Sequence, residues 1–154
     1  MATSKTIGPA GVTAAIEQLA SAIDQRHAAS ASLVLLGVAN GGVALAAELA
    51  RRLRHARRHI AVGTIDISFH RDDIGRHPIP KEFQPTHIPR DITGATVILI
   101  DDVLFSGRTI KAALDELFDH GRPAKVELAV LVDRGGRRLP VAADYTGLTL
   151  LADE

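Results

Sequence analysis

The fold of this chain is decided by one stretch, Thr96-Val97-Ile98-Leu99-Ile100-Asp101-Asp102-Val103-Leu104-Phe105-Ser106-Gly107-Arg108-Thr109. Residues 96–100 form an unbroken β-branched and aliphatic run, which is typical of a strand covered on both faces in a parallel sheet. The run stops at Asp101 and Asp102. The pattern therefore predicts two acids at the carboxyl end of a buried strand, where open α/β sheets bind their ligands.

A small-residue turn and a helix follow the two acids. Ser106, Gly107 and Thr109 allow a tight turn whose backbone N–H groups can converge on an anion. Apolar residues then recur at helical spacing, namely Ile110, Ala113, Leu114, Leu117 and Phe118. The positive end of this helix would point into the turn, which predicts a phosphate site, while the acids could hold sugar hydroxyls directly or through a metal. The alternative is that Asp102 or Ser106 merely caps the helix.

The composition limits the class of protein and of partner. The chain has 154 residues, 46% of them hydrophobic, which suits one domain with a core of its own. Aromatic residues make up only 3%, so stacking of bases on a flat aromatic surface is not expected. Basic and acidic residues number 18 each, and this balance argues against a general attraction to nucleic acids or membranes.

The sequence indicates a cytoplasmic protein without a membrane anchor. It contains no cysteine, which excludes disulfides and cysteine-based zinc sites and is compatible with the cytosol. The N-terminus lacks the basic-then-apolar order of a signal peptide. No apolar run approaches the length that crosses a bilayer.

A second strand–loop–helix unit precedes the first stretch. Residues 1–11 are expected to be loosely ordered, and Thr13 is expected to cap a helix that runs to about Ala28. A buried strand over 32–37 would then lead into a loop and a helix over 43–55; the loop is Val38-Ala39-Asn40-Gly41-Gly42. Neither loop matches Gly-x-Gly-x-x-Gly or the Walker pattern, which argues against dinucleotide-binding folds and P-loop NTPases.

The remaining segments complete the expected sheet. Strands are predicted over 60–69, 126–132 and 143–151. The proline-rich segment 74–91 has no periodicity and is interpreted as a flexible lid near the phosphate loop. His77 and His87 within it are interpreted as exposed residues rather than ligands, because no third ligand is spaced with them. Since the carboxyl ends of parallel strands gather at one edge, the polar loops there predict a ligand site.

Basic residues gather after the first predicted strand–loop–helix unit, namely Arg51, Arg52, Arg54, His55, Arg57, Arg58 and His59. One interpretation is a solvated helix end, where the helix dipole favours cations. The other is a patch that binds RNA or phosphate.

Residues 97–109, which hold the two acids and the small-residue turn, resemble the phosphoribosyl pyrophosphate (PRPP) signature of type I phosphoribosyltransferases. Residues 68–73, 115–123 and 128–135 look like the PyrR family, the pyrimidine operon attenuator proteins that also have uracil phosphoribosyltransferase activity. The resemblance covers roughly residues 33–147. It implies an α/β fold with a mostly parallel central sheet flanked by helices, a flexible lid, a small hood and assembly into a homo-oligomer.

The resemblance also implies roles for the residues of the opening stretch. Asp101 and Asp102 would accept hydrogen bonds from the ribose hydroxyls, and residues 105–109 would wrap the 5′-phosphate. The full PRPP-binding set is Asp101, Asp102, Val103, Leu104, Phe105, Ser106, Gly107, Arg108 and Thr109. Mg²⁺ would bridge pyrophosphate and ribose oxygens, with no direct protein ligand assigned.

Three other segments receive roles in the same way. Val38, Ala39, Asn40, Gly41 and Gly42 would form the pyrophosphate loop, where family members often hold a strained non-proline peptide. Arg71 and Asp72 would begin the closing loop and act with the two aspartates in catalysis. The uracil edge would be read, largely through backbone groups, by Leu131, Val132, Asp133 and Arg134.

The chain departs from the family pattern at a few positions. Gly41 and Gly42 stand where many relatives carry an arginine. Gly136, Arg138 and Ala142 differ in a region that RNA-binding members use, which favours a retained nucleotide pocket over a retained RNA surface. The sequence also stops at residue 154, before the edge strands with which relatives usually end.

The resulting prediction is a uracil phosphoribosyltransferase that forms UMP and pyrophosphate from uracil and PRPP. Binding of pyr leader RNA, under the control of UMP, is a possible second function of the same pocket. Three alternatives stay open: a nucleotide-sensing RNA-binding regulator with little or no turnover, a phosphoribosyltransferase for another base, and a phosphate-binding protein without turnover.

Overall fold

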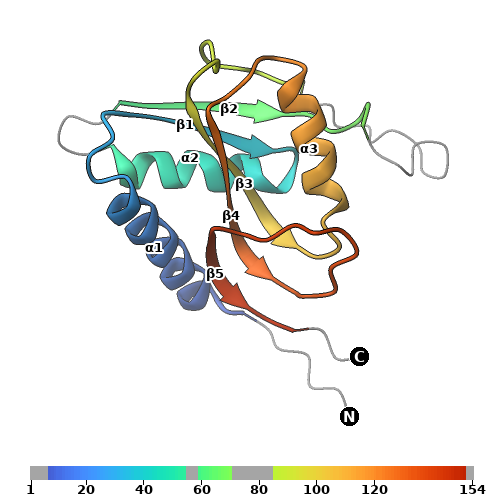
Figure 1. The fold of residues 1–154 in the computed structure, drawn as a ribbon. Coiled ribbons are helices and arrows are strands. Elements are labelled where there is room, and N and C mark those ends of the chain that lie inside the picture. Colours follow the sequence, from blue (N-terminus) through green and yellow to red (C-terminus); the bar gives the residue numbers. More distant parts are fainter. Residues whose placement is uncertain (1–6, 55–58, 71–84, 152–154) are drawn as a thin grey trace.

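A five-stranded sheet and three helices make up the described parts of the chain in a computed structural model, which describes residues 7–54, 59–70 and 85–151 (Figure 1). In chain order the elements are α1 (Pro9–Arg26), β1 (Ser32–Val38), α2 (Gly41–Leu53), β2 (His59–Ile65), β3 (Thr96–Leu104), α3 (Arg108–Phe118), β4 (Lys125–Asp133) and β5 (Tyr145–Thr149). The strand order is β2-β1-β3-β4-β5, and every neighbouring pair is parallel. The predicted α/β fold with a parallel sheet is therefore confirmed.

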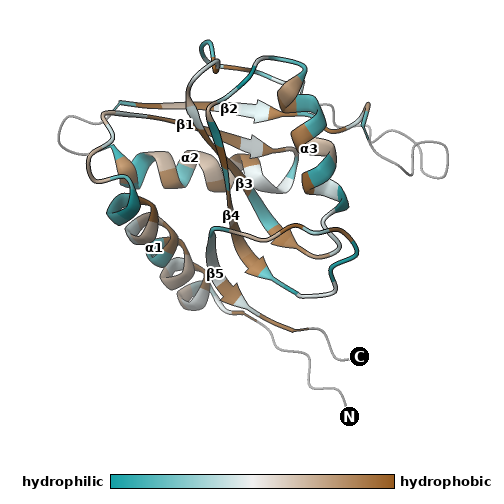
Figure 2. Ribbon diagram, in the orientation of Figure 1, coloured by the Kyte–Doolittle hydropathy of each residue, from teal (hydrophilic) through white to brown (hydrophobic). Residues whose placement is uncertain are grey.

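The two faces of the sheet are covered by different helices, with α1 and α2 on one face and α3 on the other (Figure 1). Successive strand residues point to opposite faces, so Ile98 packs with the α1 and α2 side chains while Leu99 packs with those of α3. Both residues are fully buried. This two-sided burial explains the continuous apolar runs of the central strands, which appear brown in Figure 2.

Helix α1 starts earlier than predicted. It begins at Pro9, because proline suits the first helical position, where no N–H partner is needed. Gly8 rather than Thr13 is the N-cap residue, and no side chain caps the helix. The prediction that residues 1–11 are loosely ordered is therefore wrong for Pro9 to Gly11, while residues 1–6 lie outside the described parts.

The structure describes only part of the predicted basic cluster, which begins at the end of α2. Arg51 and Arg52 both bond to the Glu48 carboxylate, and Arg54 donates to the carbonyl of Ile60. Residues 55–58 lie outside the described parts. These contacts fit a solvated helix end, because Arg51 and Arg52 form ion pairs with Glu48, one turn earlier on the same helix.

Of the predicted lid, residues 74–91, the structure describes only residues 85–91. Thr64 and His87 exchange two backbone hydrogen bonds of 2.9 and 2.8 Å, and Thr86 Oγ1 accepts the N–H of Asp66 at 2.8 Å. Residues 85–91 are thus held against β2, which corrects the lid prediction for that half, and His87 is exposed as expected. Residues 71–84 lie outside the described parts. None of the helices described is long and apolar enough to cross a membrane.

Candidate active site

Strand β3 continues through both acids and ends at Leu104, so the acids lie near the carboxyl end of a buried strand as predicted, although the strand extends beyond the apolar run. The parallel ladder with β4 explains this, because Asp101 pairs with Val130 and Leu104 with Asp133. Asp101 is buried, with 5% of its surface exposed, whereas Asp102 is exposed. Side chains alternate along a strand, but these two neighbouring carboxyl groups are still close enough to interact.

Asp101 is the electrostatically unusual member of the pair. Burial raises its pKa to about 8, and the neighbouring Asp102 carboxylate adds to this effect. The N–H of Asp102 donates to Asp101 Oδ1 at 2.9 Å, which opposes the rise in pKa. Asp101 therefore holds its proton at neutral pH and can both donate and accept a hydrogen bond.

Asp102 lies directly against the predicted pyrophosphate loop. A Cβ added at Gly41 would collide with the Asp102 carboxylate, and one added at Gly42 would collide with the carbonyl of Ile100. The two glycines therefore allow the start of α2 to approach β3 more closely than any other residue type would. As a result, the end of β1 and the acids of β3 are brought into contact.

The loop between β1 and α2 has a second unusual feature. The peptide bond between Ala39 and Asn40 is cis, at the place where the family resemblance implies an unusual non-proline peptide. The N–H of Ala39 donates to the carbonyl of Ile65 at 2.9 Å, and the N–H of Val43 donates to the carbonyl of Asn40 at 3.3 Å. The loop is thus held by the end of β2 on one side and by the first turn of α2 on the other.

The turn between β3 and α3 is built around Gly107. This residue is the N-cap of α3 with a φ of +94°, a left-handed conformation that favours glycine. Ser106 Oγ accepts the N–H of Arg108 at 3.2 Å, whereas Asp102 Oδ1 accepts the N–H of Val103 at 2.8 Å. Asp102 is therefore not a helix cap, and the capping alternative is wrong for that residue. The N-terminus of α3 opens toward the turn, as the sequence predicted.

Arg137 joins the loop after β4 to the turn after β3. Its guanidinium donates to Asp133 Oδ2 at 2.7 Å, to the carbonyl of Phe105 at 2.8 Å and to that of Val141 at 2.8 Å. The hydrogen bond from Arg137 is the main cause that lowers the pKa of Asp133. Sequence reasoning missed this role, although an arginine four residues after a strand-end acid was an available signal.

The predicted base-binding segment is only partly open. The side chains of Leu131 and Val132 pack in the core, and the backbone of Asp133 lies between β3 and β5. Arg134 is exposed and lies over the ring of Phe105, with 5.0 Å from its Cζ to the ring centre. The open part of this segment is therefore the Arg134–Phe105 pair rather than the strand before it.

Three loops thus meet at the carboxyl edge of the sheet, after β1, β3 and β4. The predicted residues of these loops lie together there. Arg71 and Asp72, the other two predicted catalytic residues, lie outside the described parts, as does His77. The edge can hold an anion at the N-terminus of α3 and polar hydroxyls at the two acids, a combination that suits a phosphorylated sugar.

Residues 7–153 match the family described as the phosphoribosyl transferase domain, and the chain therefore belongs to this family of phosphoribosyltransferases. Among solved structures, a hypoxanthine-guanine phosphoribosyltransferase from Bacillus anthracis superposes with a TM-score of 0.74 at 23% identity, over 100% of this chain and 85% of that one. At this identity the likeness concerns the fold.

Curated relatives place the chain more narrowly. A Streptomyces coelicolor protein called Bifunctional protein PyrR is 50% identical over 137 residues, 88% of this chain and 70% of the relative. A Roseiflexus protein with the same name is 48% identical over 135 residues, 86% of this chain and 73% of the relative. Within the phosphoribosyltransferases the chain belongs with the PyrR proteins, which confirms the resemblance seen in its motifs.

Proposed function

We propose that this protein is a uracil phosphoribosyltransferase, which forms UMP and pyrophosphate from uracil and PRPP. The observation that carries the proposal is the contact between Gly41 and the Asp102 carboxylate. It puts the loop assigned to pyrophosphate beside the acids assigned to ribose, which is the arrangement that one bound PRPP molecule needs.

Each part of PRPP then has a group suited to it. The 5′-phosphate would bind the backbone N–H groups of residues 106–109 at the N-terminus of α3, where the helix dipole favours an anion. The ribose hydroxyls would meet Asp101 and Asp102, one of them neutral and the other exposed. Pyrophosphate would lie on the backbone of residues 38–42, at the N-terminus of α2.

The donor set also fits Mg²⁺. The exposed Asp102 carboxylate offers hard oxygen atoms, and the soft thiolate ligands of other metals are absent from the chain. Asp102 and the oxygens of PRPP would hold the ion, which when bound neutralises charge on the pyrophosphate group.

The transfer itself needs no protein nucleophile. A uracil ring nitrogen forms a bond to the anomeric carbon while the bond from that carbon to the pyrophosphate oxygen breaks, and the ring N–H proton passes to the released pyrophosphate or to water. The protein supplies position and orientation, since the loops hold both reactants in line. Arg137 bonds to both Phe105 and Asp133, and so holds the segment assigned to the base against the turn assigned to the 5′-phosphate.

The test has two stages. Calorimetric titration of the wild-type chain with PRPP and Mg²⁺ should give one site, and later addition of uracil should release pyrophosphate. Guanine, hypoxanthine and orotate are the matched controls, and turnover with one of them but not with uracil would identify a different base. PRPP binding without pyrophosphate release would leave a binding protein.

RNA binding is the second candidate, favoured by the name of the relatives, Bifunctional protein PyrR. The exposed Arg51 lies at the end of α2, but its partnership with Glu48 reduces the charge that it offers to RNA. A mobility shift with pyrimidine leader RNA would support the role. It should be measured at physiological salt, because contacts to phosphate make the affinity fall steeply as the salt concentration rises. No shift in the presence of UMP would exclude it.

We also propose that the protein acts in the cytoplasm as a homo-oligomer. The absence of cysteine supports the compartment, since cytosolic proteins need no disulfides. Sedimentation of the purified chain would give its mass in solution.

A further inference from the structure

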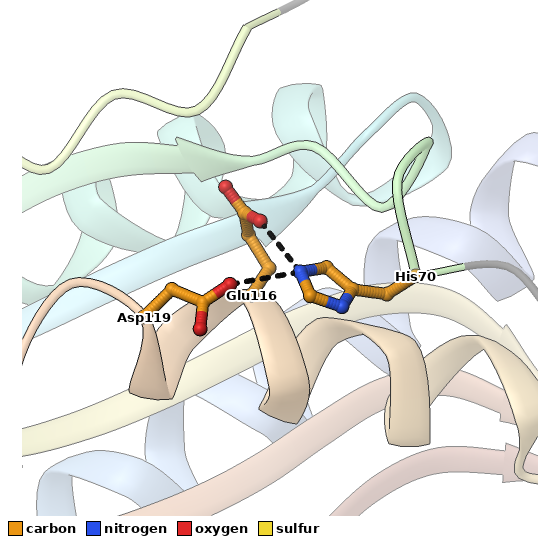
Figure 3. Close-up of side chains that lie close together, drawn as sticks. All are labelled: His70, Glu116 and Asp119. Atoms are coloured by element: carbon orange, nitrogen blue, oxygen red, sulfur yellow. Dashed lines mark hydrogen bonds and ion pairs between the residues drawn. The ribbon is translucent and has the colours of Figure 1, made fainter.

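A cluster of metal-ligating side chains lies outside the candidate active site. His70, which follows β2, points toward Glu116 and Asp119 at the end of α3 (Figure 3). Its Nε2 atom lies 3.0 Å from Glu116 Oε2 and 3.0 Å from Asp119 Oδ2. One atom from each of the three side chains falls within 4.8 Å of the others.

These spacings are close to those of a tetrahedral metal site. Zinc lies about 2.0–2.2 Å from imidazole nitrogen and carboxylate oxygen, which puts neighbouring ligand atoms of a tetrahedron roughly 3.3–3.6 Å apart. The two separations of 3.0 Å from His70 therefore need to open only slightly for an ion to enter. A mixed nitrogen and oxygen set suits Zn²⁺ or Co²⁺ better than Mg²⁺.

The Glu116 carboxylate is held in the orientation that such a site requires. Its Oε1 atom accepts the hydroxyl of Thr86 at 2.8 Å and lies 3.0 Å from His120 Nε2. Thr86 is itself fixed, because its Oγ1 accepts the N–H of Asp66. Oε2 is therefore the atom presented to His70. Outer contacts of this kind orient the carboxylate ligands of metals.

The Glu116 carboxylate is also well shielded, since only 13% of the side chain is exposed to water.

The length of α3 separates the cluster from the turn around Gly107, to which the 5′-phosphate is assigned. Glu116 lies eight residues after Arg108 on this helix, a rise of about 12 Å. Glu116 and Asp119 are three residues apart, so they share one face of the helix end. The site thus joins the chain after β2 to the far end of α3, away from the acids of β3.

We propose that His70, Glu116 and Asp119 bind one Zn²⁺ ion, which fastens the segment after β2 to helix α3. Without metal the same three side chains form an ion-paired hydrogen-bond cluster. Zinc binding would replace the two contacts of the His70 imidazole with one coordinate bond from each of the three side chains. The site lies at the opposite end of α3 from the turn assigned to the 5′-phosphate.

The test is calorimetric titration of the full chain with ZnCl₂ in millimolar Mg²⁺, which occupies oxygen-rich sites first. One Zn²⁺ per chain is expected, together with a rise in melting temperature. Replacement of Zn²⁺ by Co²⁺ should give the visible absorption of a low-coordinate ion. His70→Gln and Glu116→Gln should lose the binding, and the exposed Asp119 gives a third variant, Asp119→Asn, that tests the site with little risk to folding.

Matched controls separate this site from adventitious binding. Asp115→Asn removes an exposed acid of the same helix that pairs with Lys111, and His87→Gln removes an exposed histidine near the cluster. Both should bind Zn²⁺ as the wild type does. Thr86→Val removes the contact that orients Glu116 and should weaken binding about 10- to 100-fold. Absence of Zn²⁺ binding in the wild type, or undiminished binding in both His70→Gln and Glu116→Gln, would overturn the proposal.

Discussion

Two buried carboxyl groups on neighbouring strands have opposite surroundings. Glu127 on β4 is 1% exposed and Asp101 on β3 is 5% exposed. Glu127 pairs in register with Ile98, three residues before Asp101, so the two acids are about 10 Å apart along the strands. One lies toward the amino edge of the sheet and the other at the carboxyl edge.

The partners of the two groups explain the difference. His27 Nε2 lies 2.6 Å from Glu127 Oε1, Tyr145 donates its hydroxyl to the same oxygen at 2.8 Å, and Arg26 donates to Oε2 at 3.2 Å. Burial alone would raise the pKa of Glu127, but bonds from His27 and Tyr145 outweigh it and lower the pKa. Asp101, beside another acid, has its pKa raised to about 8.

The comparison shows how one fold uses buried acids in two ways. At the amino edge the protein itself supplies the donors, so Glu127 fastens α1 and β5 to β4. At the carboxyl edge the N–H of Asp102 donates to Asp101, and no cation among the described residues contributes to its pKa, which fits the proposal that ribose hydroxyls bind there. Glu127 should therefore affect stability and Asp101 should affect binding.

The largest expected effect is on PRPP binding. Replacing both acids, Asp101→Asn and Asp102→Asn, should weaken PRPP binding by roughly 100-fold or more while the chain stays folded, because both carboxyl groups assigned to the ribose hydroxyls are lost. Calorimetry with PRPP and Mg²⁺, together with circular dichroism, measures the two quantities. Unchanged PRPP affinity in the folded double variant would contradict the site assignment.

The next effect is on stability. Glu127→Gln removes the charge that four described partners face, namely Arg26, His27, Lys125 and Tyr145, and should lower the free energy of unfolding by about 3–5 kcal/mol. Urea unfolding gives this value. The control is Glu48→Gln, since Glu48 also bonds two arginines but on the surface of α2, and its loss should cost little. If both variants lost the same free energy of unfolding, burial of Glu127 would not contribute to the stability of the protein.

The pH dependence of stability should separate the two acids. The folded state keeps a proton on Asp101 between the ordinary value of 3.8 and about 8, so raising the pH through this range favours unfolding. Asp101→Asn should remove that loss and be more stable than the wild type at about pH 9, by roughly 1–3 kcal/mol, but not at about pH 5.

Glu127 should act in the opposite direction. Its folded pKa is lowered, so its contribution is complete above the ordinary value of 4.5 and is lost as the pH falls below it. Unfolding curves over a pH series test both signs, and a gap between Asp101→Asn and the wild type that is the same at every pH would refute the protonation of Asp101.

The smallest effect concerns the contact between Gly41 and Asp102. Gly41→Ala puts a methyl group against the Asp102 carboxylate and should weaken PRPP binding about 10-fold by displacing it. The matched change is Gly8→Ala, where an added Cβ meets nothing within 4 Å among the described residues. If Gly41→Ala bound PRPP normally, the approach of the two loops would be unimportant for the site.

Much of this edge could be predicted from sequence because its signals are local. The apolar run before Asp101, the small residues around Gly107 and the helical spacing after them each describe a few consecutive residues. Strand ends were less predictable. Residues 101–104 stay in β3 because β4 offers a partner there, and no pattern within the segment reveals that pairing.

The network of Arg137 illustrates a second limit. Its guanidinium reaches the Phe105 carbonyl, 32 residues away in the chain, and only the packing of the two loops creates that contact. The same holds for the His70, Glu116 and Asp119 cluster, whose members come from two segments 46 or more residues apart. Side chains that meet through tertiary packing leave no regular spacing in the sequence.

The residues alone determined the parallel α/β class, the turn between β3 and α3 and the position of the two acids, because backbone preference and apolar periodicity are short-range properties. Tertiary structure decided the charge on each acid. Asp101 and Glu127 are the same kind of group, and burial with or without donors from distant segments gives them opposite pKa shifts. Desolvation and hydrogen bonding are properties of the surroundings, so they follow only once the chain has folded.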